Sequence, residues 1–426
     1  MQSPECNGVI ADSSKTFYFT LMKEKVIIMG AGIQGICCAL ALAESCNEII
    51  LIDKTPEPLL RSGLRNEGKI HMGFVYANDP GFRTASLMLQ SALQFAPLIE
   101  TFIGRPVDWI PLRAKKFSYL ILNDTMVAED KILQHYARLQ QEYNQIKSGS
   151  LHYMGVQLDS IWEDSYNQPP IINFDRIQRC IPTEEVAIDL VKFRDLLLGE
   201  IAKRSNIHFL GNCDIKSIEQ TTYGYTIQGL NGDQKAWTKE SSTVINCLWE
   251  NRLYFDKQLG ISPQKKWVYR LKHRILGKAS ANIAALDSYT FVLGAFGDIV
   301  NYSDESTYLS WYPACMSGWS TDLTTPQSWE DACNGKMVLE NNRDWVNKAL
   351  VELDTYFPGM KDFEVNQIDG GIIFSWGKTD IVDNESELHQ RFNIGIHQQE
   401  GYFSIDTGKF TSAPLFAQEL KQLLFA

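Results

Sequence analysis

The chain has 426 residues, 44% of them apolar, and 51 acidic side chains against 40 basic ones give a formal net charge of −11 at pH 7. This length can bury a large core divided among two or three structural units, which excludes a single small binding module. The acidic balance lacks the basic surface that attracts phosphate backbones and anionic lipids, so we expect no nucleic-acid partner.

Nine cysteines are scattered along the chain without a CxxC pair or zinc-ligand spacing. The pattern indicates reduced thiols, a cytoplasmic location and no metal site. Cys37 and Cys38 fall in a predicted helix, where we expect small apolar side chains rather than a redox pair. We expect no transmembrane segment, because the longest apolar run, 26–43, is broken by three glycines.

Residues 1–21 have neither the short basic region nor the continuous apolar stretch of a secretory signal. We expect them to form a loose, disordered extension. Met22 is a second possible start of the chain.

The best-defined unit begins with an apolar, β-branched run at 25–29, typical of a strand buried on both faces. Gly-Ala-Gly-Ile-Gln-Gly follows at 30–35, then a predicted helix at 36–45 and a second strand at 48–53. Together these segments predict a βαβ unit of about thirty residues.

Each glycine of this unit has a physical role. Gly30 permits the tight turn, Gly32 lets the backbone approach a pyrophosphate, and Gly35 lets helix and strand pack closely. The free N–H groups at the helix N-terminus favour phosphates, and Asp53 can accept hydrogen bonds from ribose hydroxyls. The unit therefore predicts a bound dinucleotide; the acid disfavours NADP but does not separate NAD from FAD.

Apolar residues at helical spacing predict further helices at 82–103, 133–145, 190–203, 328–356 and 412–425. The sections at 105–180 and 265–330 are rich in Tyr, Trp, Val and Ile with interspersed turn residues, which is typical of antiparallel sheet. The two kinds of segment are interleaved rather than joined end to end.

Two segments resemble the D-amino-acid-oxidase-like (DAO) superfamily, which includes glycine and sarcosine oxidases, glycerol-3-phosphate dehydrogenase and 2-hydroxyglutarate dehydrogenase. Residues 60–76 are similar to its second FAD-contacting loop, a polar, glycine-containing stretch that ends in His-x-Gly. Residues 401–415 resemble its C-terminal Gly-Lys-hydrophobic-Thr element, which faces the pyrimidine side of the flavin. There the Lys409 ammonium and a helix N-terminus could stabilise negative charge on reduced flavin near N1 and O2.

The resemblance implies an α/β fold, α+β overall, with a Rossmann-like FAD-binding domain and an interleaved, mainly antiparallel substrate domain. The expected FAD-binding domain comprises 22–104, 181–262 and 366–426, and the expected substrate domain comprises 105–180 and 263–365. The residues expected to contact FAD are Gly30, Ala31, Gly32, Ile33, Gln34, Gly35, Asp53, Lys54, Arg65, Asn66, Glu67, Gly68, Lys69, Ile70, His71, Ile215, Cys247, Gly371, Gly408, Lys409, Phe410 and Thr411.

The chain departs from the family pattern in two places. Residues 248–252 are bulkier than the small residues usual there. Residues 368–375 lack the arginine that often binds the substrate carboxylate in the amine oxidases.

His71 is the leading candidate for a catalytic base; its alternative role is a buried, hydrogen-bonded contact beside the flavin. Residues 267–275 alternate like a strand, and Arg270, Lys272 and Arg274 share one face, which either binds an anionic substrate or lies in solvent. Residues 308–313 form a predicted strand whose aromatic side chains could form a wall over the flavin, with core packing as the default explanation. The candidate substrate contacts are Tyr269, His273, Tyr308 and Tyr312.

From these observations we expect an FAD-dependent oxidoreductase that oxidises a small amino acid or amine at C–N by hydride transfer to flavin N5. Electrons would pass to oxygen or another acceptor. The alternatives are FAD-dependent oxidation of a hydroxy acid or sugar alcohol at C–OH, an NAD-dependent dehydrogenase, and a non-catalytic flavin-binding protein.

Overall fold

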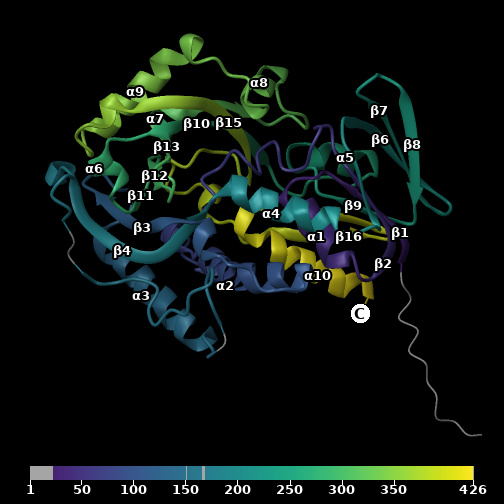
Figure 1. The fold of residues 1–426 in the computed structure, drawn as a ribbon, viewed down its shortest axis with the longest axis horizontal. Coiled ribbons are helices and arrows are strands. Elements are labelled where there is room, and N and C mark those ends of the chain that lie inside the picture. Colours follow the sequence, from purple (N-terminus) through teal and green to yellow (C-terminus); the bar gives the residue numbers. More distant parts are fainter. Residues whose placement is uncertain (1–22, 150, 166–167, 426) are drawn as a thin grey trace, which may run out of the picture.

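The structure is a computed structural model that describes residues 23–149, 151–165 and 168–425. Within these ranges the strands form three sheets with helices packed around them, an α/β arrangement (Figure 1). The extension predicted at 1–21 lies outside the described residues. No described helix is both long enough and apolar enough to cross a membrane.

The first sheet contains the glycine-rich βαβ unit. Its strand order is β16-β17-β9-β1-β2-β5, and every neighbouring pair is parallel except β16 and β17. The strands are β1 (Lys23–Met29), β2 (Cys46–Ile52), β5 (Ile207–Leu210), β9 (Thr243–Asn246), β16 (Gly395–Gln399) and β17 (Tyr402–Asp406). Segments far apart in the sequence therefore assemble one six-stranded sheet.

Both faces of this sheet are covered, which explains the uninterrupted apolar run in β1. Val26 and Ile28 pack into a core with the helices on one face, whereas Ile27 and Met29 pack against a small sheet on the other. The small sheet contains β6 (Cys213–Thr221), β7 (Gly224–Asn231) and β8 (Ala236–Ser241).

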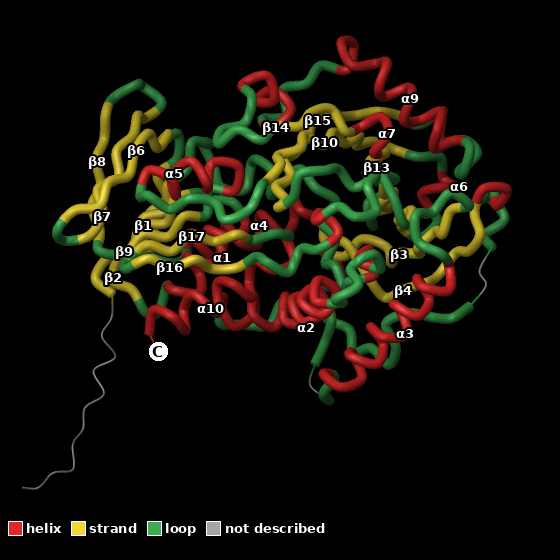
Figure 2. Tube along the Cα trace, turned by 180° about the vertical axis from the view of Figure 1, so that it is seen from behind, coloured by secondary structure: helices red, strands yellow, loops and turns green. Residues whose placement is uncertain are grey.

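Helices α1 (Ile33–Leu42), α2 (Arg83–Ile103) and α10 (Ala413–Phe425) contact one another, and α2 and α10 lie below the six-stranded sheet in Figure 2. α4 (Leu190–Ala202) contacts α1. Cys37 and Cys38 are fully buried in α1 as free thiols, as the sequence pattern predicts for small apolar side chains. A short helix, α5 (Arg252–Gln258), lies beside β6.

The third sheet has eight strands, in the order β14-β10-β13-β12-β11-β3-β4, with β15 also paired to β10. It is antiparallel except between β3 and β11. Its strands are β3 (Arg113–Leu122), β4 (Ile177–Ile188), β10 (Trp267–Lys278), β11 (Ser288–Val292), β12 (Gly297–Asn301), β13 (Thr307–Trp311), β14 (Met316–Ser320) and β15 (Glu364–Trp376).

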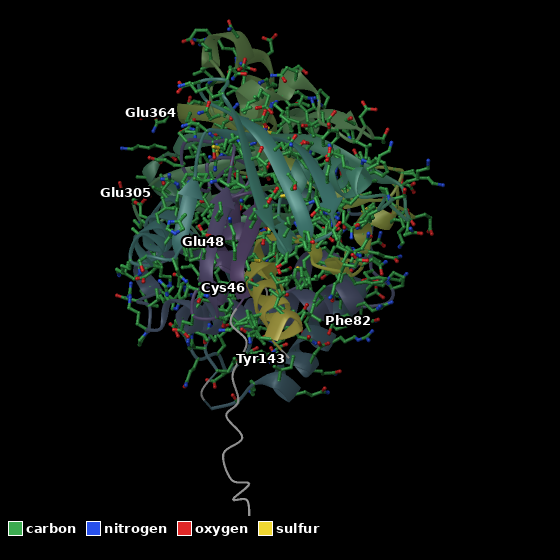
Figure 3. All side chains as sticks on the ribbon, turned by 90° about the vertical axis from the view of Figure 1, so that its right-hand side faces the viewer. Cys46, Glu48, Phe82, Tyr143, Glu305 and Glu364 are labelled. Atoms are coloured by element: carbon green, nitrogen blue, oxygen red, sulfur yellow. The ribbon has the colours of Figure 1, made fainter. Side chains whose placement is uncertain are left out.

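Further helices cover this sheet on opposite sides of the molecule. α9 (Arg343–Asp354) packs on the core that contains Ile275 and Leu309, and α3 (Glu129–Ile146) packs near β3 and β4. Figure 3 shows Glu364 of β15 and Tyr143 of α3 at opposite ends of the view. The remaining short helices are α6 (Ala281–Ala284), α7 (Tyr312–Cys315) and α8 (Glu330–Cys333).

Three sequence-based expectations differ from the structure. The first helix begins at Ile33, inside the glycine motif, and ends at Leu42 rather than spanning 36–45. The single helix expected at 328–356 is wrong, because Gly335, at φ +68°, lies in a break between α8 and α9. Strands β4 and β15 cross the predicted domain boundaries at 181 and 366 and both pair in the eight-stranded sheet.

Candidate active site

A cavity runs between the six-stranded and eight-stranded sheets. Its walls include the segments that follow the carboxyl ends of four parallel strands, β1, β2, β9 and β17. Ligands of open α/β sheets bind at this edge.

The glycine turn has the geometry that its sequence predicts. A Cβ placed on Gly35 would lie 1.9 Å from the carbonyl oxygen of Gly30, so only glycine allows this helix to approach the strand. A Cβ placed on Gly32 would meet nothing within 4 Å, so the backbone there is open to the cavity. No side chain caps the N-terminus of α1, which leaves its first N–H groups for an anion.

Asp53 is fixed beside this turn. Its Oδ2 accepts a hydrogen bond from the Ala31 backbone N–H at 2.7 Å, and its Oδ1 accepts from the backbone N–H and hydroxyl of Thr55 at 2.9 and 2.8 Å. The carboxylate keeps further lone pairs for ribose hydroxyls. The open backbone at Gly32, the uncapped helix and the oriented acid together fit an FAD pyrophosphate and its adjoining ribose.

A short helix covers the same part of the cavity. Glu330 of α8 accepts hydrogen bonds from Lys54 at 3.3 Å and from Arg61 at 2.8 Å, and Arg61 also donates to Glu250 at 2.7 Å. These ion pairs connect the segment between β14 and β15 to the loop that follows β2.

The opposite part of the cavity, which we call the substrate end, is lined by Glu67, Lys69, His71, Lys272, Arg391 and Lys409. The loop at 60–76 supplies the first three side chains, and two backbone hydrogen bonds to β4 hold it: Ile70 donates to Val186 at 3.0 Å, and Ile188 donates to Gly68 at 2.8 Å.

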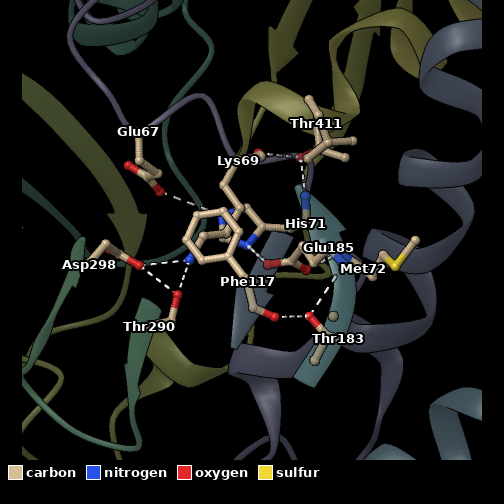
Figure 4. A network of polar contacts seen from close by, with 12 residues as sticks. Glu67, Lys69, His71, Met72, Phe117, Thr183, Glu185, Thr290, Asp298 and Thr411 are labelled. Atoms are coloured by element: carbon tan, nitrogen blue, oxygen red, sulfur yellow. Dashed lines mark hydrogen bonds and ion pairs between the residues drawn. The ribbon is translucent and has the colours of Figure 1, made fainter. Parts of the chain in front are cut away.

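His71 lies between two carboxylates (Figure 4). Its Nε2 is 3.7 Å from Glu67 Oε1, and its Nδ1 is 3.9 Å from Glu185 Oε1. Glu185 is fully buried and is held by the Tyr119 hydroxyl and by the Met72 N–H at 2.5 Å. Glu67 lies on the cavity side, so the three side chains form a line from the cavity into the interior.

Burial, reinforced by Lys409 and Lys69, lowers the pKa of His71 to about 3. Burial alone would raise the pKa of Glu67, but the contact with His71 and the charges of Lys272 and Lys409 hold it well below its ordinary value. Burial raises the pKa of Glu185. At neutral pH, a neutral imidazole therefore contacts an ionised Glu67 at the cavity wall.

Lys69 and Lys272 share one carboxylate. Asp298 lies 2.6 Å from Lys69 Nζ and 3.7 Å from Lys272 Nζ, and Lys69 also donates to the Thr290 hydroxyl. Lys69 lies over the Phe117 ring, 4.1 Å from its centroid. Lys272 extends from β10 to the cavity wall.

Arg391 and Lys409 form no ion pair within the described part of the chain. Arg391 donates to the Ser375 hydroxyl at 2.7 Å and to the Leu388 carbonyl at 3.3 Å. Burial and Arg270 lower its pKa to about 10, and burial, Arg391, Lys272 and Lys69 lower the pKa of Lys409 to about 7. Two cations at the cavity thus lack an anionic partner.

All but four of the residues expected to contact FAD line the cavity. The exceptions support the site from behind. Gly35 packs on Gly30, Gly68 adopts φ +71° against Ile188, and Ile70 is fully buried. The Thr411 hydroxyl accepts from the His71 N–H at 3.0 Å and donates to the Lys69 carbonyl at 3.3 Å.

Of the candidate substrate contacts, only Tyr308 lines the cavity. Tyr269 packs with Phe374, and His273 lies against Trp345 at 4.9 Å between ring centroids, so both occupy the opposite face of β10. The Tyr312 hydroxyl bonds Asp380 and Arg270 outside the cavity wall. The expectation that these three side chains contact substrate in this cavity is therefore not met.

The solvated alternative for the cationic face of β10 is also wrong. Arg270 is 2% exposed and pairs with Asp380 at 3.4 Å, and Arg274 is 7% exposed and pairs with Asp369 at 2.5 Å. The alternation was correct, but acids elsewhere in the chain allow this charged face to point inward.

The sequence reasoning missed Arg391 and Arg61 as cavity residues, and it named Lys272 only as one of three cations on a strand face that could bind an anionic substrate. Arg391 lies in an irregular segment between the 3₁₀ turn at Glu387–His389 and β16, where no periodicity predicts its direction. Residues 368–375 lie on β15 and contain no arginine, whereas Arg391 comes from the loop beyond this strand. Arg391 donates a hydrogen bond to Ser375, which lies on β15.

A family model described as FAD dependent oxidoreductase, DAO, matches residues 25–421. The D-amino acid dehydrogenase of Rhizobium johnstonii is 36% identical over 339 residues, which cover 70% of this chain and 78% of that protein.

Solved structures show the same fold. The glycine oxidase of Geobacillus kaustophilus has a TM-score of 0.65 at 14% identity, covering 94% of this chain and 95% of that one. The L-amino acid deaminase of Proteus myxofaciens, in complex with anthranilate, has a TM-score of 0.63 at 13% identity, covering 95% and 90%.

Proposed function

The chain belongs to the DAO family of FAD-dependent oxidoreductases, and we propose that it oxidises a small amino acid or amine at its C–N bond. The predicted family, FAD cofactor and enzyme class are confirmed by the family match and the Rhizobium relative. The relatives described above are named for amino acids, which supports the proposal for this chain.

The observation that carries the proposal is Arg391. Its guanidinium borders the cavity, and no acid of the described residues pairs with it. A planar guanidinium matches a carboxylate through two parallel hydrogen bonds. We assign Arg391 to the substrate carboxylate, in place of the arginine that is missing from 368–375.

Glu67 and His71 would handle the substrate ammonium. An ionised carboxylate at the cavity wall attracts the ammonium, and the neutral His71 ring orients that carboxylate from behind. Both groups are weak bases at these pKa values, so the proton that leaves the nitrogen as its N–H bond breaks would pass to neutral Lys409, whose pKa is about 7. Glu185 holds the other side of the ring.

Bound FAD would supply the oxidant, accepting the hydride that leaves the substrate carbon. The residues proposed to hold it are the cavity-lining ones near Gly32 and Asp53 at the phosphate and ribose end, with Lys409 beside the flavin. A cation there stabilises negative charge on the ring. Oxygen or another acceptor would then reoxidise it.

A second candidate is oxidation of a hydroxy acid at C–OH. It is favoured by the neutral His71, because an uncharged imidazole can form a hydrogen bond with a substrate hydroxyl without a charge to pair. Arg391 would serve both substrates, so the carboxylate does not separate them. The ionised Glu67 favours the amino compound, because a hydroxyl carries no charge for it to bind.

Matched pairs of compounds test the proposal. The FAD-loaded protein is mixed without oxygen with D- and L-amino acids and with the 2-hydroxy acids of the same skeletons, and the visible flavin absorbance is followed. We expect amino acids to bleach it and hydroxy acids to leave it unchanged. Bleaching by hydroxy acids alone would replace C–N oxidation by the second candidate.

A further inference from the structure

The substrate end of the cavity has an excess of positive charge. Three cations, Lys69, Lys272 and Arg391, and a fourth basic side chain, Lys409, whose pKa is about 7, face two carboxylates, Glu67 and Asp298. Glu185 lies behind His71, where burial favours its neutral acid. Buried charges require partners, so the excess predicts that a ligand supplies negative charge here.

The excess lies in two separate places. Arg391 sits beside Ser375, next to a second arginine, Arg270, whose own partner is Asp380. Lys272 lies at the other place, where the nearest acid, Asp298, is already hydrogen-bonded to Lys69 and leaves a 3.7 Å separation. Each place therefore has a cation whose hydrogen-bonding capacity is incompletely used.

A bound amino acid with an uncharged side chain would not neutralise all the positive charge at the substrate end. Its carboxylate would pair with Arg391 and its ammonium with Glu67, but Lys272 would keep only its 3.7 Å contact with Asp298, which it shares with Lys69. A second carboxylate on the substrate would complete the pairing. The Lys272 side chain lines the cavity and is 18% exposed.

We propose that the substrate is an acidic amino acid, with its side-chain carboxylate bound by Lys272 and its α-carboxylate by Arg391. Lys272 is then the residue that determines specificity. The inference rests on the proposed amino-acid oxidation for the reaction, but its charge preference applies to binding alone and can be measured without turnover.

The first test uses ligands that cannot be oxidised at a C–N bond. Glutarate and its monoamide, glutaramate, have the same skeleton and differ by one carboxylate, as do succinate and succinamate. Binding to the FAD-loaded protein is followed by the shift of the flavin absorbance. We expect the better dicarboxylate to bind about tenfold or more tightly than its monoamide, as for a charge-assisted hydrogen bond. Equal affinities, or no binding of either pair, would overturn the inference.

A variant identifies the side chain responsible. Lys272→Met should bind dicarboxylate and monoamide equally while keeping its flavin spectrum. Lys278→Met is the matched control, because Lys278 lies on the same strand but is exposed, and it should keep the wild-type preference. Retention of that preference in Lys272→Met would also overturn the assignment, and the wild-type comparison stands without either variant.

Turnover separates this inference from the proposed function. Glutamate and aspartate should bleach the flavin at lower concentrations than glutamine and asparagine. If dicarboxylates bind preferentially but no amino acid bleaches the flavin, the proposed reaction fails and the charge preference stands. If glutamine and glutamate are equally effective, the reaction stands and the inference fails.

Discussion

Arg391 is the residue proposed to bind the substrate carboxylate. It borders the cavity, and its guanidinium is oriented by Ser375 and by the carbonyl of Leu388. Removing it would leave a substrate carboxylate without its charged donor, which typically costs about 1.5–3 kcal/mol. The loss should appear mainly in KM, because the carboxylate is held equally before and during the reaction.

We predict that Arg391→Met lowers kcat/KM for the best amino acid by roughly tenfold to a hundredfold while the flavin absorbance is retained. Steady-state kinetics check this, with Arg343→Met as the control variant. Arg343 lies on α9, its side chain is 63% exposed, and it does not line the cavity. An unchanged kcat/KM in Arg391→Met would remove the residue from the site.

The sequence predicted which side chains of β10 share a face, but not which of the two faces points toward the cavity. The alternation along β10 was correct, yet Tyr269 and His273 face the core and Lys272 faces the cavity. The direction depends on Asp298, Asp369 and Asp380, which come from other strands and loops and neutralise the charged face. A single strand pattern contains no information about such partners.

Among the elements, the turn from β1 into α1 contains one glycine that helix packing requires, Gly35, and one glycine that borders the cavity, Gly32. A Cβ at Gly35 would collide with a backbone oxygen, whereas a Cβ at Gly32 would enter the open cavity. Gly32 also has an ordinary backbone conformation, at φ −70°, so a larger residue there brings no backbone strain.

We predict that Gly35→Val lowers the free energy of unfolding by about 2 kcal/mol or more, as overpacking does, and that Gly32→Val leaves unfolding of the FAD-free protein nearly unchanged. Gly32→Val should instead weaken FAD binding, because its side chain occupies the place of the pyrophosphate. Denaturant unfolding and FAD titration measure the two effects. Normal FAD affinity in Gly32→Val would place the phosphates elsewhere.

Local pattern was sufficient for the elements that have strong periodicity or glycine spacing. β1, α2 and α10 agree with their predicted ranges to within a few residues. The stretch 328–356 was wrong because apolar spacing continues across Gly335, whose left-handed conformation ends the helix. The backbone conformation of Gly335 alone ends the helix, and hydrophobic periodicity averaged over many residues does not detect it.

On the scale of the whole molecule, four of the described histidines are buried, His71, His135, His273 and His389, and burial also lowers the pKa of His389. Burial lowers the pKa of His71 to about 3 and the pKa values of His135 and His273 to about 4, below the ordinary 6.5. Between these values and 6.5 the unfolded chain binds protons that the folded chain does not. The free energy of unfolding from these groups therefore rises with pH and falls as the solution becomes acidic.

We predict a contribution of up to about 1.4 kcal/mol per pH unit from each histidine on the acid side of pH 6.5. His273→Gln tests it, because His273 contacts Ser317 and Trp345 rather than the cavity. Urea unfolding from pH 7 to pH 5 should show a smaller pH slope for the variant than for the wild type. Identical slopes would mean that His273 titrates alike in both states.

The interleaving of the two kinds of segment was also predictable, but its exact boundaries were not. β4 and β15 each extend across a predicted boundary. Both are continuous strands of the eight-stranded sheet, and the sequence does not mark the residue at which the chain passes from one domain to the other. The domain division stays a prediction. The site lies between the sheets, which explains why its residues come from distant parts of the chain.

The central claim is that this cavity oxidises a C–N bond. The most direct measurement is a single anaerobic turnover of the FAD-loaded protein with the best amino acid, followed by quantification of ammonia against the flavin reduced. We predict one ammonia, and one matching 2-oxo acid, for each flavin bleached, because the imine formed hydrolyses in water. Flavin reduction without ammonia release would contradict C–N oxidation and leave the family's fold with a different chemistry.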